Sequence, residues 1–125
     1  MVVEGLYYTK EHEWVKIDGD MAIIGITDYA QEMLGEITYV EMPKLDKEVE
    51  AGDDLAVVES SKAASDVYAP VAGRVVEVNP ELETRPELIN EDCYDTGWLC
   101  RMETSKNAAS GLMSSSEYEE FLKGL

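Results

Sequence analysis

One lysine stands in a setting that suits covalent modification. Lys62 lies between two apolar segments of strand-like sequence, and its neighbours Ser61 and Ala63 are small. Gly52 and Gly73 bracket these segments at nearly equal distances from the lysine. We therefore expect Lys62 at the tip of a β-hairpin, with its ammonium group projected into solvent where a modifying enzyme can reach it. A second interpretation stays open at this point, because most lysines only keep a surface turn soluble.

The other reactive side chains form no recognisable catalytic or metal-binding pattern. His12 is the only histidine, and Cys93 and Cys100 are the only cysteines, so the sequence lacks a plausible set of zinc ligands. We expect both cysteines to be buried, reduced thiols. A small hydrolase that uses His12 with Ser60 or Ser61 is an alternative, although no orienting acid stands at a recognisable spacing and no nucleophile-elbow motif is present.

The composition is that of a small and strongly acidic globular protein. The 125 residues are 45% hydrophobic and 30% charged, with a formal net charge of −17. We expect one domain over residues 1–125, because a chain of this length buries a single core without metals or disulfides. So much negative charge repels phosphates, which excludes nucleic acid and anionic membranes as partners. Basic protein surfaces suit it, since complementary charge speeds encounter, but plain solubility explains the acidity equally well.

The sequence shows no signal for export or membrane insertion. Residues 1–5 contain no basic and apolar leader, and no apolar run approaches the length of a membrane span. We expect a cytoplasmic protein, or one of the mitochondrial matrix if the sequence is a mature organellar form.

Short runs of β-branched and aromatic residues, separated by glycine and aspartate, predict a mostly β protein. The runs 13–17 and 21–26 flank the turn cluster Asp18-Gly19-Asp20 and predict a β-hairpin. The other predicted strands are 36–41, 55–59, 66–68, 74–78 and 98–102.

Helix signals are few and mark short elements. Thr27 or Asp28 is placed to cap a helix that ends at Leu34, with Gly35 behind it. Prolines near the start predict single helical turns over residues 79–82 and 85–88.

The end of the sequence carries a stronger helix signal. Ser114 and Glu117 have the spacing of a capping box ahead of Tyr118 and Phe121. We therefore expect an amphipathic helix in a C-terminal helical segment of about 105–125.

Several motifs together resemble one known family. The segment around the lysine, Val58-Glu-Ser-Ser-Lys-Ala-Ala-Ser-Asp66, is followed by Ala69-Pro-Val-Ala-Gly73 and Asn79-Pro80 and looks like a lipoylation segment. Further matching motifs run along nearly the whole sequence in order: Tyr8 to Trp14, Gly25 to Gln31, Leu34 to Glu36, Asn90 to Asp92, and Gly97-Trp98. Through these motifs the sequence is similar to the glycine cleavage system H-protein family.

The resemblance implies a fold and a cofactor. The fold is a mostly β barrel-sandwich hybrid of the lipoyl/biotinyl type, with short helices, a C-terminal helix and a lipoyl-hairpin core of about residues 52–80. Lipoate is attached through an amide to the lysine that matches Lys62, and no residue is catalytic in the usual sense. The hairpin frame around this lysine consists of Glu59, Ser61, Ala63, Gly52 and Gly73.

The resemblance also implies a shuttle with a defined set of partners. The lipoyl arm accepts the aminomethyl group of glycine at the pyridoxal-phosphate-dependent glycine decarboxylase. The methylene passes to tetrahydrofolate at the aminomethyltransferase, with release of ammonia, and dihydrolipoamide dehydrogenase reoxidises the dithiol with NAD. A lipoate-attaching enzyme is a further partner, and we expect the carrier to be a monomer. A tethered arm speeds each transfer because it replaces free diffusion by a high effective concentration.

A protective cleft for the loaded arm is the third implication. The aminomethyl cargo loses formaldehyde and ammonia unless its amine stays protonated, and a carboxylate in a water-poor cleft favours the protonated form. Glu13 and Asp66 match the positions that line such a cleft in the family. Glu11 and Met33 depart from the family pattern of a short polar residue and a histidine, and we expect Met33 to pack in the core.

Two alternatives keep the same fold. The first is a lipoyl donor that relays lipoate to other enzymes, and the second is a lipoyl or biotinyl domain of a different complex. Biotin acceptors usually have methionines beside the lysine, whereas Ser61 and Ala63 flank Lys62. The resemblance of the helical and C-terminal motifs favours the H protein over an isolated acyltransferase lipoyl domain.

Overall fold

The two apolar runs that flank Asp18-Gly19-Asp20 fold back on each other as predicted. Strands β2 (Glu13–Asp18) and β3 (Met21–Ile26) pair antiparallel over their whole length. Gly19 in the turn has a φ of 64°, a conformation that glycine adopts without the steric cost of a side chain.

The other elements follow from a computed structural model that describes residues 1–105 and 107–125. Lys106, a part of the predicted C-terminal segment 105–125, lies outside the described residues. The remaining strands are β1 (Tyr7–Tyr8), β4 (Ile37–Glu41), β5 (Glu48–Val49), β6 (Asp54–Ser60), β7 (Ala64–Tyr68), β8 (Gly73–Val78) and β9 (Cys100–Glu103). The helical elements are α1 (Asp28–Leu34), the 3-10 turn η1 (Pro80–Glu83), α2 (Leu88–Asp92) and α3 (Ser115–Lys123).

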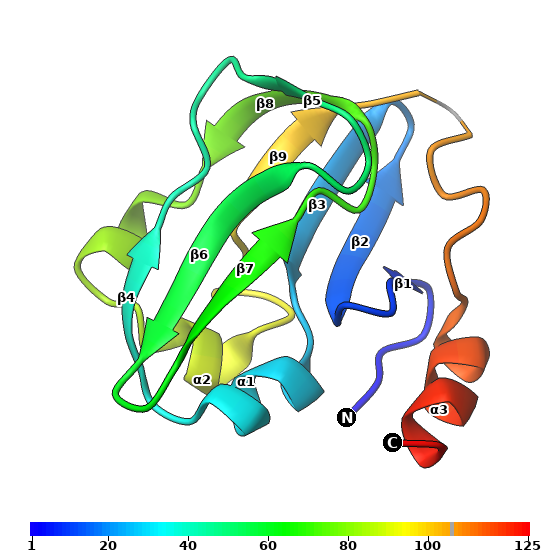
Figure 1. Cartoon of the computed structure of the whole chain (residues 1–125). Coiled ribbons are helices and arrows are strands. Elements are labelled where there is room, and N and C mark those ends of the chain that lie inside the picture. The colour runs from blue at the N-terminus through cyan, green and yellow to red at the C-terminus, as the bar shows by residue number, and fades with distance from the viewer. Residues whose placement is uncertain (106) are drawn as a thin grey trace.

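The strands form two antiparallel sheets (Figure 1). One sheet has six strands in the order β1-β2-β3-β9-β8-β5, and the other has three in the order β4-β6-β7. In Figure 1 the β6–β7 hairpin lies in front of β2, β3 and β9, and its turn points to the end of the molecule where α1 and α2 lie. The predicted mostly β fold, with short helices and a C-terminal helix, is confirmed.

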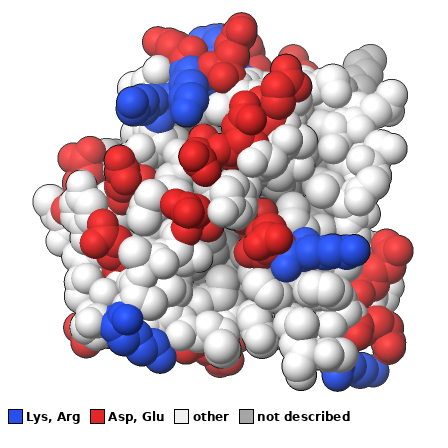
Figure 2. Space-filling view, viewed as in Figure 1, with Lys and Arg blue, Asp and Glu red and all other residues white. Residues whose placement is uncertain are grey.

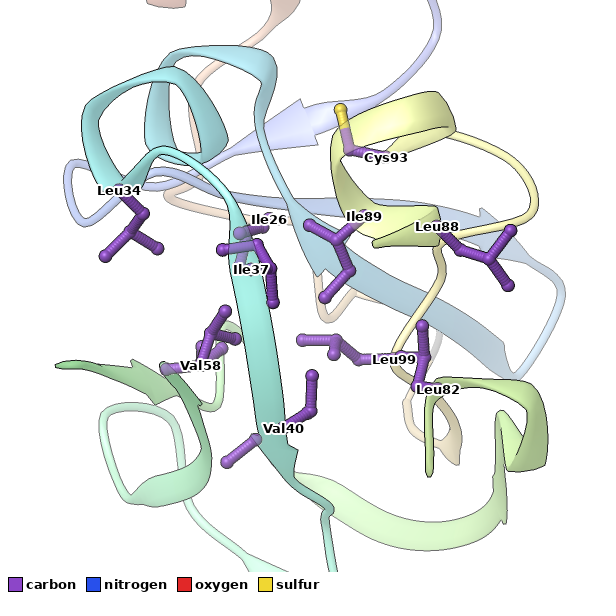
Figure 3. Packing of buried hydrophobic residues seen from close by; sticks show 12 residues of the cluster. Ile26, Leu34, Ile37, Val40, Val58, Leu82, Leu88, Ile89, Cys93 and Leu99 are labelled. Carbon is purple, nitrogen blue, oxygen red and sulfur yellow. The ribbon is translucent and has the colours of Figure 1, made fainter. Parts of the chain in front are cut away.

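Apolar side chains from both sheets fill the space between them. Ile26 of β3, Val58 of β6 and Leu99 before β9 belong to one buried cluster, to which α1 and α2 contribute Leu34 and Ile89 (Figure 3). A second buried cluster continues the core and includes Val15, Ile24, Leu55, Val75 and Met102. Because residues from both sheets contribute to each cluster, the hydrophobic effect holds the β6–β7 hairpin against the larger sheet.

The predicted cap residues of α1 take their expected places. Thr27 Oγ1 accepts a hydrogen bond from the main-chain N–H of Ala30 at 3.3 Å. Gly35 ends the helix with a φ of 81° and donates its N–H to the carbonyl of Gln31 at 2.9 Å. The end of α1 is therefore fixed next to the first residue of β4.

The C-terminal helix α3 is tied to the N-terminal strands by aromatic contacts. The predicted capping box of Ser114 and Glu117 is confirmed, since each side chain bonds the main-chain N–H of the other residue. Tyr118 stacks on Tyr8 with ring centroids 4.5 Å apart, and its hydroxyl lies 2.7 Å from His12 Nδ1 and 2.9 Å from Thr27 Oγ1.

Some details of the sequence interpretation differ from the structure. The strand predicted over 98–102 begins at Cys100, because the N–H of Trp98 donates to Asp95 in a turn. The helical turn predicted over 85–88 is closed by the N–H of Leu88, which donates to the carbonyl of Arg85 at 3.1 Å, and it continues into α2. The short strands β1 and β5 were not predicted, since two-residue strands depend on pairing with β2 and β8 rather than on their own sequence.

Acidic side chains predominate among the charged residues, with 27 Asp and Glu against ten Lys and Arg. In Figure 2 the red acidic residues are scattered over the visible face, and the blue basic residues form a few small groups. Over the part of the chain that is described, none of the helices has both the length and the apolar character required to cross a bilayer.

Candidate functional site

Lys62 lies at the tip of the β6–β7 hairpin, as its sequence setting predicts. The main-chain N–H of Ser60 donates to the carbonyl of Ala63 at 2.8 Å and closes the turn. Ser60 Oγ then accepts hydrogen bonds from the N–H groups of Lys62 at 3.3 Å and Ala63 at 3.1 Å. Ser60 was not predicted in this role, although serine is a residue that commonly holds a tight turn through its hydroxyl. The turn is thus fixed while the Lys62 side chain stays exposed.

The stem of Lys62 lies over the glycine that ends α1. A Cβ atom at Gly35 would come within 3.3 Å of Lys62 Cε and 3.6 Å of Lys62 Nζ. The positive φ of Gly35 and this close approach both favour glycine at this position. Gly35 therefore leaves space beside the stem of Lys62.

The residues of the predicted hairpin frame lie in two places. Ser61 and Ala63 are exposed beside the lysine, and Glu59 is half-buried on β6. Gly52 lies in the turn before β6, at the other end of the hairpin, with a φ of +93°. Gly73 begins β8, and a side chain there would overlap the carbonyl oxygen of Glu103 on the neighbouring strand. The two glycines thus allow a turn and a close approach of two strands, and neither lies at the hairpin tip that carries Lys62.

Glu13 is a buried carboxylate at the start of β2. Only 2% of the residue is exposed. Its Oε1 accepts a hydrogen bond from Thr9 Oγ1 at 2.5 Å, and its Oε2 accepts one from the main-chain N–H of Tyr68 at 3.1 Å. Burial raises the pKa of Glu13, the two hydrogen bonds act in the opposite direction, and the charge of Glu11 raises it further.

Glu13 lies in the wall between two cavities. A small one of about 20 Å³ is lined by Glu13 and Asp66 together with apolar side chains of β3, α1, β6 and β7. A larger one of about 340 Å³ lies beyond it and includes Thr9, Tyr68 and Pro70 in its lining. The structure therefore brings the two predicted cleft residues, Glu13 and Asp66, to one cavity, with Glu13 buried and Asp66 exposed at its rim.

The small cavity is lined by residues that neighbour the lysine's surroundings in sequence. Its lining includes Leu34, the residue directly before Gly35, and Ala30 one turn earlier in α1. On the opposite side it is lined by Ser65, Asp66 and Val67 of β7, which follow the hairpin turn. The structure thus has an exposed amine at the hairpin tip and a buried acid in the wall of a cavity that α1, β6 and β7 also line.

Comparison with known proteins settles the family of this chain. The family model described as glycine cleavage H-protein matches residues 6–125. The chain belongs to this family.

Similar proteins cover nearly the whole chain. A glycine cleavage system H protein from Alkaliphilus oremlandii is 54% identical over 120 residues, which span 95% of this chain and 94% of the relative. The one from Carboxydothermus hydrogenoformans is 51% identical over 124 residues, which span 98% and 95% of the two chains. The crystal structure of the glycine cleavage system H protein from Mycobacterium marinum matches with a TM-score of 0.90 at 35% identity, and the match covers 99% of this chain and 100% of that one. The barrel-sandwich fold predicted from the sequence is therefore confirmed.

The two departures from the family pattern have different surroundings. Glu11 is exposed and contributes to the lining of both cavities, so it adds a third carboxylate to this region. Met33 is 62% exposed, and the prediction that it packs in the core is wrong. It lies on the outer face of α1, because the inner face is taken by Leu34 and Ala30.

The geometry around His12 does not form a hydrolase site. His12 Nδ1 is paired with the hydroxyl of Tyr118, and burial lowers the pKa of the imidazole. The hydroxyl of Ser60 is engaged in the hairpin turn. His12 therefore has a structural place between β2 and α3, separate from the two serines.

Both cysteines are free and buried, as the sequence predicts. Burial raises the pKa of Cys93 and of Cys100 to about 12. Such thiols remain protonated at neutral pH and are poor nucleophiles.

Because burial raises the pKa of Glu13, we predict that this residue makes the free energy of unfolding depend on pH. A carboxyl group with a folded pKa above its unfolded pKa contributes stability that is present below the unfolded value and is lost as the pH rises through the folded value. Glu13→Gln cannot ionise. Its free energy of unfolding relative to the parent should therefore increase as the pH rises from below the ordinary glutamate pKa through the raised pKa of Glu13. Urea denaturation of both proteins across this range measures the difference.

The exposed carboxylate of Glu48 on β5 provides a matched control. The difference between Glu48→Gln and the parent over the same pH range gives the baseline for removing a surface carboxyl group. A difference for Glu13→Gln that changes with pH no more than this baseline would contradict an energetic cost of ionising the buried carboxyl group.

Proposed function

We propose that this chain is the lipoyl carrier of the glycine cleavage system, with lipoate joined by an amide to Nζ of Lys62. The observations that carry the proposal are the exposed Lys62, whose stem lies over Gly35, and the cavity lined by Glu13 and Asp66. In this proposal the lipoyl arm follows a track from the lysine over Gly35 to that cavity. Membership of the glycine cleavage H-protein family supports it. In this function the chain is a component that carries a group between enzymes and performs no catalysis alone.

The residues present fit a lipoyl group at this site. The missing side chain at Gly35 leaves room for the stem of Lys62, and the exposed turn gives access to a lipoate-attaching enzyme. Beyond Gly35 the track is lined by apolar residues, including Leu34 and Val58. When attached, lipoate supplies a disulfide that takes up the aminomethyl group of glycine and is restored by oxidation of its two thiols.

The chain's own contribution is to hold the cargo in its protonated form. The lone pair of the amine can expel the thiolate, after which water releases formaldehyde and ammonia, so protonation of the amine slows the loss. Glu13, in a site with little water, favours the ammonium form strongly, while the exposed Asp66 adds a weaker, screened attraction.

The partners in this proposal are the other components of the glycine cleavage system. They are the pyridoxal-phosphate-dependent glycine decarboxylase, the tetrahydrofolate-dependent aminomethyltransferase and dihydrolipoamide dehydrogenase. The net charge of −17 supports fast encounter with basic surfaces on such enzymes without requiring tight complexes. A tethered arm that meets each active site in turn benefits from a high effective concentration.

The attachment site is tested by substitution of Lys62. Lys62→Arg keeps the positive charge but cannot form the amide, so the protein should fold normally and gain no lipoyl group when it is incubated with a lipoate-attaching enzyme. Lys16→Arg, at an exposed position of β2, is the matched control and should be lipoylated like the parent. Intact mass and peptide mapping measure the result. Lipoylation of Lys62→Arg, or a lipoyl group found on another lysine of the parent, would refute the assignment.

The protective role of the cleft predicts faster loss of cargo from variants. Lipoylated Glu13→Gln and Asp66→Asn, loaded and then separated from the partner enzymes, should release formaldehyde faster than the parent. We expect an increase of about tenfold for the buried Glu13 and at most about fivefold for the exposed Asp66. Asp18→Asn, an exposed position in the β2–β3 turn region, should match the parent. Equal release from all four proteins would mean that neither cleft carboxylate acts on the cargo.

A further inference from the structure

We propose that Thr9 is a positioning residue that keeps the carboxyl group of Glu13 ionised and aimed at the cleft. Thr9 lies four residues before Glu13, in the loop between β1 and β2. The inference deepens the proposed function, since its value to the carrier rests on the role of Glu13 toward the cargo. Its central claim concerns only the unmodified chain and is tested there.

The two residues form a closed pair of main-chain and side-chain hydrogen bonds. The N–H of Thr9 donates to the carbonyl of Glu13 at 3.0 Å, and the N–H of Glu13 donates to Thr9 Oγ1 at 3.1 Å. Thr9 Oγ1 lies 2.5 Å from Glu13 Oε1. The loop closes through His12, whose φ of 69° turns the chain back toward Thr9. The main chain thus holds the hydroxyl of Thr9 in place next to the carboxyl group.

The hydroxyl of Thr9 donates its hydrogen to Oε1 of Glu13. A main-chain N–H can only donate, so the N–H of Glu13 occupies one of the two lone pairs of Thr9 Oγ1. The hydroxyl hydrogen of Thr9 is not used in that bond and serves the carboxyl group. The other oxygen, Oε2, receives the N–H of Tyr68, which also can only donate. Two fixed donors favour an ionised acceptor, because the protonated acid places its own hydrogen on one of the two oxygens.

The charges that face Glu13 are negative and oppose its ionisation, so the two hydrogen-bond donors are the groups that favour the ionised form. Glu11 acts on it from the β1–β2 loop, and Asp66 lies on the same cavity wall from β7. The phenol of Tyr68, also on β7, stands near the same acids and near Asp54 of β6. Among the described ion pairs, none includes Glu13. The surrounding charges and the burial therefore oppose ionisation, while Thr9 and the amide of Tyr68 support it.

Thr9 is the part of this arrangement that a substitution can remove. The donor of Tyr68 belongs to the main chain, whereas the donor of Thr9 is a side chain that also lines the larger cavity. Without the hydroxyl, the carboxyl group would ionise only at higher pH. A neutral carboxyl group cannot hold an ammonium ion, so the pH at which the cleft becomes anionic depends on Thr9.

A carbon-13 NMR titration of the Glu13 carboxyl group in the unlipoylated chain tests the inference. In Thr9→Val, which has the shape of threonine without the hydroxyl, the midpoint should rise by about one pH unit. Thr9→Ser keeps the donor and should titrate within about 0.3 units of the parent. Amide spectra verify the fold of each variant, and Thr9→Ala carries the same expectation as Thr9→Val should the valine variant fail to fold. An unchanged midpoint in both donor-free variants, or an equal rise in Thr9→Ser, would overturn the inference.

A second measurement separates this inference from the proposed function. The pH at which loaded protein begins to retain its cargo should move upward in Thr9→Val by the same amount as the titration midpoint, and Thr9→Ser should restore the parent profile. If Glu13→Gln retains cargo as well as the parent does, the cleft role of Glu13 is refuted, while the carboxyl titration still decides the role of Thr9. If Glu13→Gln loses cargo quickly and the Thr9→Val profile matches the parent, Thr9 alone is refuted.

Discussion

The buried carboxylate of Glu13 joins the two sheets at the cavity where we propose that the cargo is held. Glu13 begins β2 of the six-stranded sheet, and its Oε2 accepts the main-chain N–H of Tyr68 on β7, an edge strand of the smaller sheet. This contact occupies a polar group on the edge of β7 and places a negative charge beside an apolar track. Burying the carboxylate is unfavourable, and the hydrophobic core that both sheets share offsets this free energy. The acid is therefore kept in a site with little water.

The other end of the track depends on glycine and on a rigid turn. Gly35 ends α1 and leaves space for the stem of Lys62, and Ser60 fixes the hairpin turn that carries the lysine. The lysine is therefore exposed at the hairpin tip, with its stem over the end of α1. An acidic surface with few basic groups suits a carrier that leaves each partner after one transfer (Figure 2).

The sequence predicted those features that depend on local pattern. The alternation in β2 and β3, the caps of α1 and α3, and the hairpin that presents Lys62 are all set by residues close together in the chain. The sequence did not predict contacts between distant residues. For example, no local pattern shows that Lys62 lies over Gly35. The Thr9 hydroxyl is only four residues from Glu13, but its role depends on burial, which a local pattern does not reveal. Met33 was assigned to the wrong face of α1 because a seven-residue helix carries too few apolar positions to define its buried side.

The central claim is that the lipoyl arm extends from Lys62 over Gly35 and brings its cargo to Glu13. Main-chain amide shifts of the lipoylated protein, recorded before and after loading with the aminomethyl group, test this claim most directly. The account predicts that loading changes the amide signals of Glu13, Ala30 and Tyr68, which surround the cleft away from the hairpin tip. Changes confined to residues 60–64 would contradict the account, because they would show an arm that carries its cargo exposed at the tip.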